Sequence, residues 1–191
     1  FEGYASNVIT SPVLRSLFSP TILFAGGYGT SVNPYTITNW TQLQNINNSN
    51  ILTLNYYFKL LKNLSSSTSD YASQASSSAN SNKGWNPLGN SSYKFTGTFD
   101  GNNYTISNLY MNYSGFPIEG VGLFGYTSSS STIKNLGVTD VNIRGYDQKV
   151  GSLVGYNFGL ITNSFSTGTL RGGSNVGGLV GTNAGTIEKS Y

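Results

Sequence analysis

The chain has 191 residues, a length that suits one domain, and only 9% of them are charged. The net charge is +3, and because the basic residues are scattered we expect no nucleic acid partner. No apolar run reaches the length of about 18 residues typical of a membrane span. Histidine and cysteine are absent, which excludes zinc-peptidase motifs, histidine-based nucleophile triads and disulfides, and we expect no metal or cofactor.

Residues 1–25 form a predicted extended N-terminal arm. The arm contains two short apolar pieces but lacks the basic start and long apolar core of an intact signal peptide. It is interpreted as a local packing or linker segment, and the alternative is a strand donated to a neighbouring molecule. The candidate subunit-contact residues are Val13, Leu14, Leu17, Phe18, Ile22, Leu23 and Phe24.

A short amphipathic helix is predicted over residues 39–47. Trp40, Leu43 and Ile46 follow one another at helical spacing after a turn-rich stretch. We expect this helix to cap the first turn of the repeated structure that follows.

A strand and a loop are predicted next. Residues 51–61 are interpreted as a strand. Residues 64–84 are rich in Ser and Asn and low in apolar content, which predicts a flexible exposed loop. The chain re-enters the fold at Trp85.

The C-terminal third of the chain repeats itself. Residues 150–165 return 26 positions later as residues 176–191, with nine of the sixteen positions identical. A period in this range indicates a stack of similar units. Each unit is too short for a strand-helix-strand element, which needs about 30 residues, and instead contains short alternating strands. We predict a β-solenoid with coils of about 26 residues. A β-sandwich with coincidentally similar strands is the alternative.

Two apolar columns are expected inside the solenoid. Stacked coils lie about 4.8 Å apart, so equivalent residues sit above one another. Gly125, Gly155 and Gly181 stand beside one column and are expected to supply positive φ at tight corners. The two columns are Ile106, Ile133, Ile161 and Ile187, and Phe99, Phe124, Val154 and Val180.

Six Asn-x-Ser/Thr sequons are candidate N-glycosylation sites. In a chain so rich in these residues several sequons arise by chance, and they become surface acceptors if an organism that N-glycosylates exports the chain. The sequons start at Asn39, Asn47, Asn63, Asn90, Asn103 and Asn112.

The glycine-leucine pattern resembles the GLUG repeat. Gly-Gly-Leu-Val-Gly-x-Asn-x-Gly-x-Ile stands at residues 177–187 and in variant form at residues 151–161, and flanking elements extend the resemblance to residues 26–191. The family occurs in large secreted surface proteins, including filamentous-haemagglutinin-like adhesins and IgA-peptidase-like proteins. The resemblance implies a right-handed parallel β-helix at the cell surface. It implies no catalysis, because the repeat lies outside the zinc site of the peptidase-like proteins.

The carboxylates offer little for catalysis. A glycosidase needs two of them facing each other across a cleft, and Asp100 with Glu119 is the pair that comes nearest to this requirement. Asp100 lies in a Phe-Asp-Gly-Asn turn sequence, so we interpret it as structural. Asp140 is expected to project outward from its strand.

Tyrosines and asparagines recur along the coils. The tyrosines form either a half-buried wall or an exposed row able to stack on sugars or contact a protein. The asparagines are interpreted as a structural column. The tyrosines are Tyr104, Tyr110, Tyr113, Tyr126, Tyr146 and Tyr156, and the asparagines are Asn108, Asn135 and Asn163.

We therefore expect a non-enzymatic structural or adhesive module at the extracellular cell surface, in contact with glycans or proteins of a host or neighbouring cell. The first alternative is a self-assembling, pilus-like filament subunit joined head to tail through its arm. No capping segment follows Tyr191, and an open last coil presents unpaired strand groups, so we expect a longer parent protein or a covering subunit. The second alternative is a carbohydrate-active β-helix enzyme.

Overall fold

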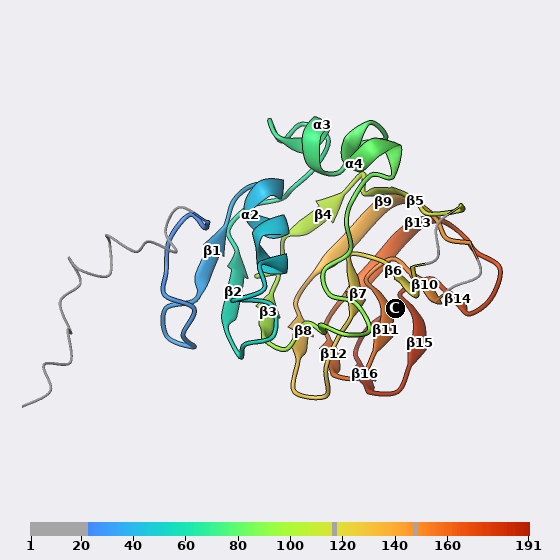
Figure 1. The fold of residues 1–191 in the computed structure, drawn as a ribbon. Helices are drawn as coiled ribbons and strands as arrows, with labels where there is room; N and C mark the ends of the chain where they lie inside the picture. Colours follow the sequence, from blue (N-terminus) through green and yellow to red (C-terminus); the bar gives the residue numbers. More distant parts are fainter. Residues whose placement is uncertain (1–22, 116–117, 147–148) are drawn as a thin grey trace, which may run out of the picture.

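The computed structural model describes residues 23–115, 118–146 and 149–191, and these form mostly short parallel strands (Figure 1). The predicted all-β class is confirmed at this level. The helices are α2 (Trp40–Gln44), η3 (Asn45–Asn47), α3 (Tyr71–Gln74) and α4 (Ala79–Asn82). The strands are β1 (Tyr35–Ile37), β2 (Tyr57–Leu60), β3 (Thr98–Asp100), β4 (Thr105–Ser107), β5 (Tyr110–Asn112), β6 (Gly120–Val121), β7 (Phe124–Tyr126), β8 (Thr132–Lys134), β9 (Gly137–Arg144), β10 (Lys149–Gly151), β11 (Val154–Asn157), β12 (Leu160–Thr162), β13 (Phe165–Arg171), β14 (Val176–Gly177), β15 (Val180–Asn183) and β16 (Thr186–Glu188).

The chain visits four sheets in the same order on successive passages. From β8 it runs through β9, β10 and β11, and then through β12, β13, β14 and β15 to β16. Each strand pairs in parallel with its counterpart one passage later. One such passage is called a coil below. The longest sheet has the order β1-β2-β3-β8-β12-β16 and links all the coils.

The predicted offset of 26 residues between paired positions is confirmed for the last coils but is wrong for the earlier ones. Val150 pairs with Val176 and Ile161 with Ile187, and both pairs reproduce the offset of the C-terminal repeat. Phe99, however, pairs with Ile133, which lies further along the chain than that offset allows. The earlier coils are longer because they carry insertions, so a uniform coil length is wrong for them.

Two assignments to the apolar columns are wrong. Ile106 pairs with Val138 in the β4–β9 ladder, and Phe99 takes the place expected of Ile106 beside Ile133. The error has a local cause. The strands of Ile106 and Ile133 are each followed by an asparagine at positive φ, so two different corners of the coil share one sequence pattern. The remaining members stack as predicted, in the columns Ile133, Ile161 and Ile187, and Phe124, Val154 and Val180.

The motif glycines serve close packing of the backbone. Gly125, Gly155 and Gly181 are not among the positive-φ glycines of the described chain, so the expected role at left-handed corners is wrong. A Cβ atom at Gly155 would lie 2.7 Å from the Cα atom of Gly120 in the preceding coil. At Gly181 it would lie 2.6 Å from the backbone nitrogen of Val150. Any side chain at these positions would force neighbouring coils apart.

The asparagines predicted as one column stand at two left-handed corners: Asn135 and Asn163 follow the paired strands β8 and β12, whereas Asn108 follows β4, which pairs with β9. Asn108, Asn135 and Asn163 have φ values of 63°, 54° and 48°. Asparagine tolerates this region better than most residues, because its short side chain can bond locally. The backbone N–H of each donates to a carbonyl in the next coil, at 3.1 to 3.2 Å. The three asparagines are therefore structural, as predicted, but their assignment to a single column is wrong for Asn108.

A separate side-chain ladder crosses three coils at β7, β11 and β15. The hydroxyl of Thr127 donates to Asn157 Oδ1, and Asn157 Nδ2 donates to Asn183 Oδ1, each at 2.8 Å. Asn157 also exchanges hydrogen bonds with the backbone of Gly159, and Asn183 does the same with Gly185. These contacts close each Asn-x-Gly segment into a turn.

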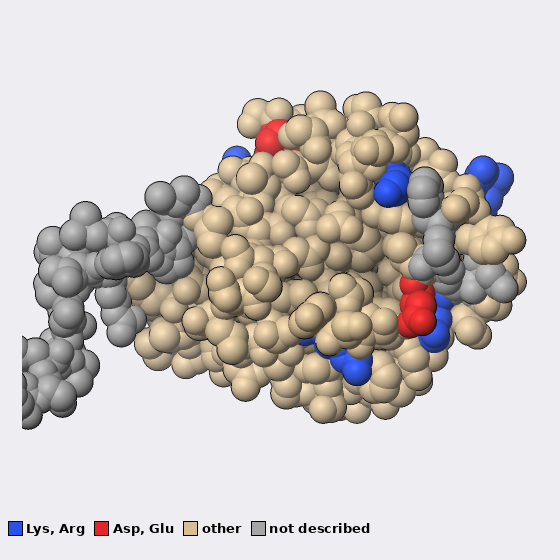
Figure 2. Space-filling model, viewed as in Figure 1, with Lys and Arg blue, Asp and Glu red and all other residues tan. Residues whose placement is uncertain are grey.

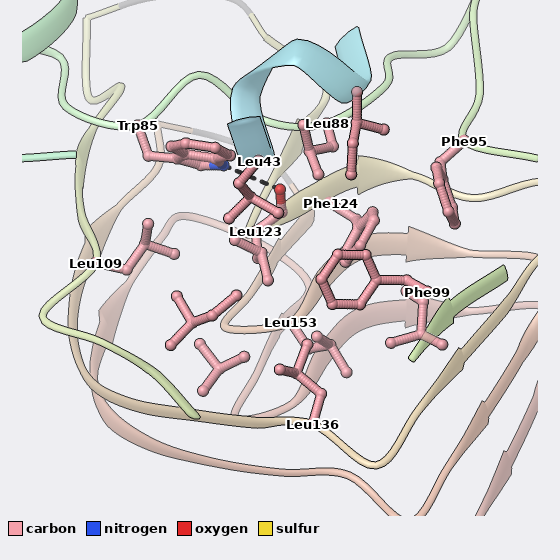
Figure 3. Close-up of a cluster of buried hydrophobic side chains, with 14 of the residues drawn as sticks. Leu43, Trp85, Leu88, Phe95, Phe99, Leu109, Leu123, Phe124, Leu136 and Leu153 are labelled. Carbon is pink, nitrogen blue, oxygen red and sulfur yellow. Dashed lines mark hydrogen bonds between the residues drawn. The ribbon is translucent and has the colours of Figure 1, made fainter. Parts of the chain in front are cut away.

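Aromatic and aliphatic side chains fill the interior of the coils (Figure 3). Phe124 lies between Phe95 and Phe99, at ring-centroid distances of 4.9 and 5.6 Å. The indole N–H of Trp85 donates to the carbonyl of Leu123 at 3.0 Å, so the polar atom of this fully buried residue is satisfied.

The predicted helix over residues 39–47 is confirmed as α2 followed by η3. Asn39 Oδ1 accepts the backbone N–H of Gln42 and caps the helix. Trp40, Leu43 and Ile46 are fully buried, and the Trp40 ring lies 5.7 Å from that of Trp85. Nowhere in residues 23–115, 118–146 or 149–191 is a helix long and apolar enough to cross a membrane.

The segment between α2 and β3 differs from its prediction. The strand expected over residues 51–61 is only four residues long, because the buried Ile51 and Leu52 lie in a turn. The loop expected to be exposed is anchored by Leu64 and Ala75, both fully buried, and contains α3 and α4. Tyr71 adds a 2.7 Å hydrogen bond from its hydroxyl to the carbonyl of Asn108. A few buried apolar residues therefore anchor this serine-rich segment to the core.

Of the candidate arm residues, only Leu23 and Phe24 fall within the described chain. Phe24 is 2% exposed and stacks on Tyr35 at a centroid distance of 4.7 Å. It packs within its own chain, so its assignment as a free subunit contact is wrong. Leu23 is partly buried against the same core. Val13, Leu14, Leu17, Phe18 and Ile22 lie outside the described residues.

Candidate functional site

The segment after α4 runs along β7, where Leu88 pairs with Phe124 (Figure 1). A pocket of about 550 Å³ opens beside this segment. Its walls come from residues 47–53, 86–93 and 118–126. We call it the Tyr93 pocket. The lining is made of amide and hydroxyl side chains, two tyrosines, a few apolar groups and one carboxylate, Glu119. Its volume falls in the range of sites for small ligands, about 300 to 1,000 Å³.

Two asparagines hold the pocket walls in place. Asn47 Nδ2 donates to the carbonyl of Pro87 and its Oδ1 accepts from the N–H of Gly89, both at 2.9 Å. Asn90 Oδ1 accepts from the backbone N–H groups of Ser92 and Tyr93 in a tight turn. That turn presents the Tyr93 ring to solvent, with 61% of the residue exposed.

Glu119 and Tyr126 form a hydrogen-bonded pair in the lining. The Tyr126 hydroxyl donates to Glu119 Oε2 at 2.9 Å. Burial raises the pKa of Tyr126, and the hydrogen bond and negative charge of Glu119 raise it further. The phenol therefore stays protonated and orients the carboxylate. Among the described residues, no Lys or Arg nitrogen lies within 4.0 Å of Glu119.

An aromatic strip continues from the pocket across the neighbouring coil. The ring centroid of Tyr156 lies 5.6 Å from that of Tyr126 and 4.4 Å from that of Phe158. Lys149 Nζ sits 5.1 Å from the Tyr156 centroid, and Lys94 Nζ sits 4.9 Å from the Phe158 centroid. We call Tyr126, Tyr156 and Phe158 the aromatic strip.

The structure does not bring the candidate carboxylates together. Asp100 Oδ1 accepts from Asn135 Nδ2 and from the N–H of Asn102, and Oδ2 lies 3.5 Å from Lys134 Nζ. Burial raises the pKa of Asp100, but these hydrogen bonds and the Lys134 charge together lower it below its ordinary value. Asp100 is absent from the lining of the Tyr93 pocket, where Glu119 lies. Its structural interpretation fits these contacts.

The remaining acidic residues of the described chain lie apart from this pair. Asp140 is exposed on β9, next to the buried Val141, as expected. Within the described part of the chain, no three acidic residues gather closely enough to hold a metal ion.

The tyrosines predicted as a row are distributed differently. Tyr113 is buried, and burial raises its pKa to about 12, while Tyr146 is 63% exposed on a loop. The rings of Tyr126 and Tyr156 are neighbours, with centroids 5.6 Å apart and planes tilted by 44°. Sequence reasoning missed Tyr93 and Phe158. The sequence Asn-Ser-Ser-Tyr at residues 90–93 could have indicated Tyr93, because it predicts a turn that carries an aromatic ring on an exposed loop.

The sequons occupy different environments. Three of the asparagines, Asn63, Asn90 and Asn103, are exposed. Asn39 and Asn47 are partly buried and engaged in the helix cap and the pocket wall, and Asn112 is partly buried at the end of β5. Glycosylation of the exposed three remains a prediction.

The repeated part of the chain matches a known family, and most of the chain is similar to two known proteins. The GLUG motif family matches residues 148–171. Halomucin of Haloquadratum walsbyi is 38% identical over 164 residues, covering 83% of this chain and 2% of halomucin. A protein of Evansella cellulosilytica named "Putative Gly-rich membrane protein" is 35% identical over 197 residues, covering 85% of this chain and 21% of that protein. The chain thus spans a small part of these relatives.

One solved structure shares the fold. The crystal structure of "a putative immunoglobulin A1 protease" from Bacteroides ovatus superposes with a TM-score of 0.61 at 24% identity, covering 88% of this chain and 46% of that one. At this identity the likeness concerns the fold alone.

Proposed function

This chain is a GLUG-motif repeat protein, and from that premise we propose that it is a non-enzymatic structural and adhesive module at the extracellular cell surface. In this proposal residues 26–191 form one right-handed parallel β-helix and residues 1–25 an N-terminal arm. The observation that carries the proposal is the in-register stacking of repeated coils in parallel ladders. Halomucin and the protein named as a putative Gly-rich membrane protein, which match 83% and 85% of this chain, support it.

The mechanism is mechanical. Backbone N–H and C=O groups of each coil bond to the coils on either side, at about 4.8 Å spacing, so bending the stack requires many hydrogen bonds to deform together. Side-chain contacts join the same coils: isoleucines stack in the Ile133–Ile161–Ile187 column, and hydrogen bonds run along the Thr127–Asn157–Asn183 ladder. A stiff stack of this kind displays fixed surface loops away from a cell.

The described surface suits this role. Solubility rests on amide and hydroxyl groups, and few charged side chains appear on the face in Figure 2. Exposed sequons at Asn63, Asn90 and Asn103 offer sites for glycans. The carboxylate pair considered for the enzyme alternative does not support it, because Asp100 bonds to Asn135 and Lys134, whereas Glu119 accepts from Tyr126.

Surface labelling tests the proposal. Antibodies against the chain should label intact producing cells, and cells lacking the protein should adhere less to their natural surface. Labelling only after permeabilisation would refute the proposed location. Hydrolysis of a polysaccharide panel that disappears in Asp100→Asn would refute the non-enzymatic assignment.

A filament subunit is the second candidate, favoured by the outermost coil. Val176 on β14 is 45% exposed and Ile187 on β16 is 37% exposed, although their equivalents Val150 and Ile161 are fully buried. A second copy, or further coils of a longer chain, stacked on this edge would cover both side chains. Negative-stain microscopy of native material should show filaments in this case, and deleting residues 1–22 should abolish them if the arm joins subunits. Monomers alone would exclude this candidate.

A further inference from the structure

We propose that the Tyr93 pocket binds a neutral saccharide chain. This inference rests on the proposed function and names the ligand class of its adhesive surface. A sugar ring has apolar C–H faces and a rim of hydroxyl groups, so its binding site needs an accessible aromatic face with polar partners around it. The Tyr93 pocket has both.

The accessible ring is Tyr93. The residue is 61% exposed, and the turn that carries it is fixed by two hydrogen bonds from backbone N–H groups to Asn90 Oδ1. A pre-positioned ring loses little freedom on binding, so more of the contact energy appears as affinity. Tyr126, the second tyrosine of the lining, is only 5% exposed, and Lys149 and Lys94 lie over the rings of Tyr156 and Phe158. Tyr93 is therefore the ring on which a sugar unit can stack.

Free polar groups surround this ring. Ser49, Thr53, Asn86 and Ser91 line the pocket, and their side chains make no hydrogen bond within the described chain. Amide groups both donate and accept, and hydroxyl groups do the same, so they match the hydroxyl rim of a sugar in either direction. The asparagines that do have partners, Asn47 among them, hold the walls.

The charge pattern selects neutral sugars over acidic ones. Glu119 is the only ionisable acid or base in the lining besides the tyrosine phenols, and Tyr126 occupies only its Oε2 atom. Oε1 remains available to accept from a sugar hydroxyl. A carboxylate, sulfate or phosphate on the ligand would meet this negative charge, and such like-charge contacts are unfavourable. Lys94 and Lys149 lie over the strip rings and not in the lining.

The test measures binding of hexasaccharides to the whole chain by titration calorimetry. The neutral probes are cellohexaose, maltohexaose, mannohexaose and chitohexaose, and the acidic probe is a galacturonate hexamer. We expect saturable binding of at least one neutral probe and weaker binding of the acidic one. Tyr93→Ala should lower the affinity about ten-fold or more. Tyr146→Ala is the matched control, since Tyr146 is 63% exposed and lies outside the pocket, and it should change nothing.

A second variant tests the charge argument. Glu119→Gln keeps the size of the side chain and removes its charge, so the preference for neutral over acidic probes should fall by about ten-fold. Circular dichroism and the unfolding midpoint confirm that each variant is folded. Absence of neutral binding, equal binding by Tyr93→Ala and wild type, or an unchanged preference in Glu119→Gln would each overturn the inference. Surface labelling of intact cells is scored separately, so a failed saccharide site at a labelled surface removes this inference alone.

Discussion

Replacing Asn157 by alanine should destabilise the protein far more than the same change one coil later at Asn183. Asn157 is fully buried and uses every polar position of its amide. It accepts from Thr127 and from the Gly159 N–H, and it donates to Asn183 and to the Gly159 carbonyl. A typical hydrogen bond contributes about 1 kcal/mol net, and each buried partner left unpaired costs about 1 to 3 kcal/mol. Because these terms overlap, we expect a loss of about 3 to 4 kcal/mol in unfolding free energy.

Asn183 is the matched control, with the same Asn-x-Gly turn in an exposed setting. Its side chain bonds to Gly185 and accepts from Asn157, but water can replace these contacts, so Asn183→Ala should cost about 1 kcal/mol. Urea unfolding monitored by circular dichroism gives both values. Equal losses in the two variants would refute the reasoning, because burial is the difference between them.

Three further comparisons test other parts of the fold. Gly155→Ala should destabilise the chain by several kcal/mol or prevent folding, because its Cβ would meet the Gly120 backbone at 2.7 Å, whereas Gly178→Ala has open space and should be nearly neutral by thermal unfolding. Ile133→Ala should cost about 2 to 5 kcal/mol, and Ile187→Ala, in the same column but 37% exposed, clearly less; similar midpoints in urea would contradict the stacking argument. Since the folded pKa of Asp100 is lowered, its contribution is present above the unfolded pKa and lost as pH falls through the folded pKa, so the stability advantage of wild type over Asp100→Asn should shrink on acidification below about pH 4. A pH-independent difference in melting temperature would show that the carboxylate charge is irrelevant there.

The repeat itself, and most of the inner columns, could be predicted from the amino-acid sequence. The near-identical residues 150–165 and 176–191 have equal lengths, so aligning them reproduces the pairing of Val154 with Val180 and of Ile161 with Ile187. The helix at Trp40 was also predictable, because its apolar spacing depends only on local sequence. The repeat period and the spacing of apolar residues can be read directly from the sequence, so they require no tertiary structure.

Register in the longer coils and the candidate site depend on the tertiary structure. Ile106 carries the same Thr-Ile-x-Asn-Leu pattern as Ile133, but insertions of different length place it in another sheet, where it pairs with Val138. Likewise, Tyr93 and Glu119 are well separated in the sequence and lie in one pocket only because the segment after α4 runs along β7. Sequence determined that this chain stacks in repeated coils, since a repeat needs only similar units. Which surface loops meet over that stack depends on insertion lengths and backbone contacts between coils, and only the folded structure decides it.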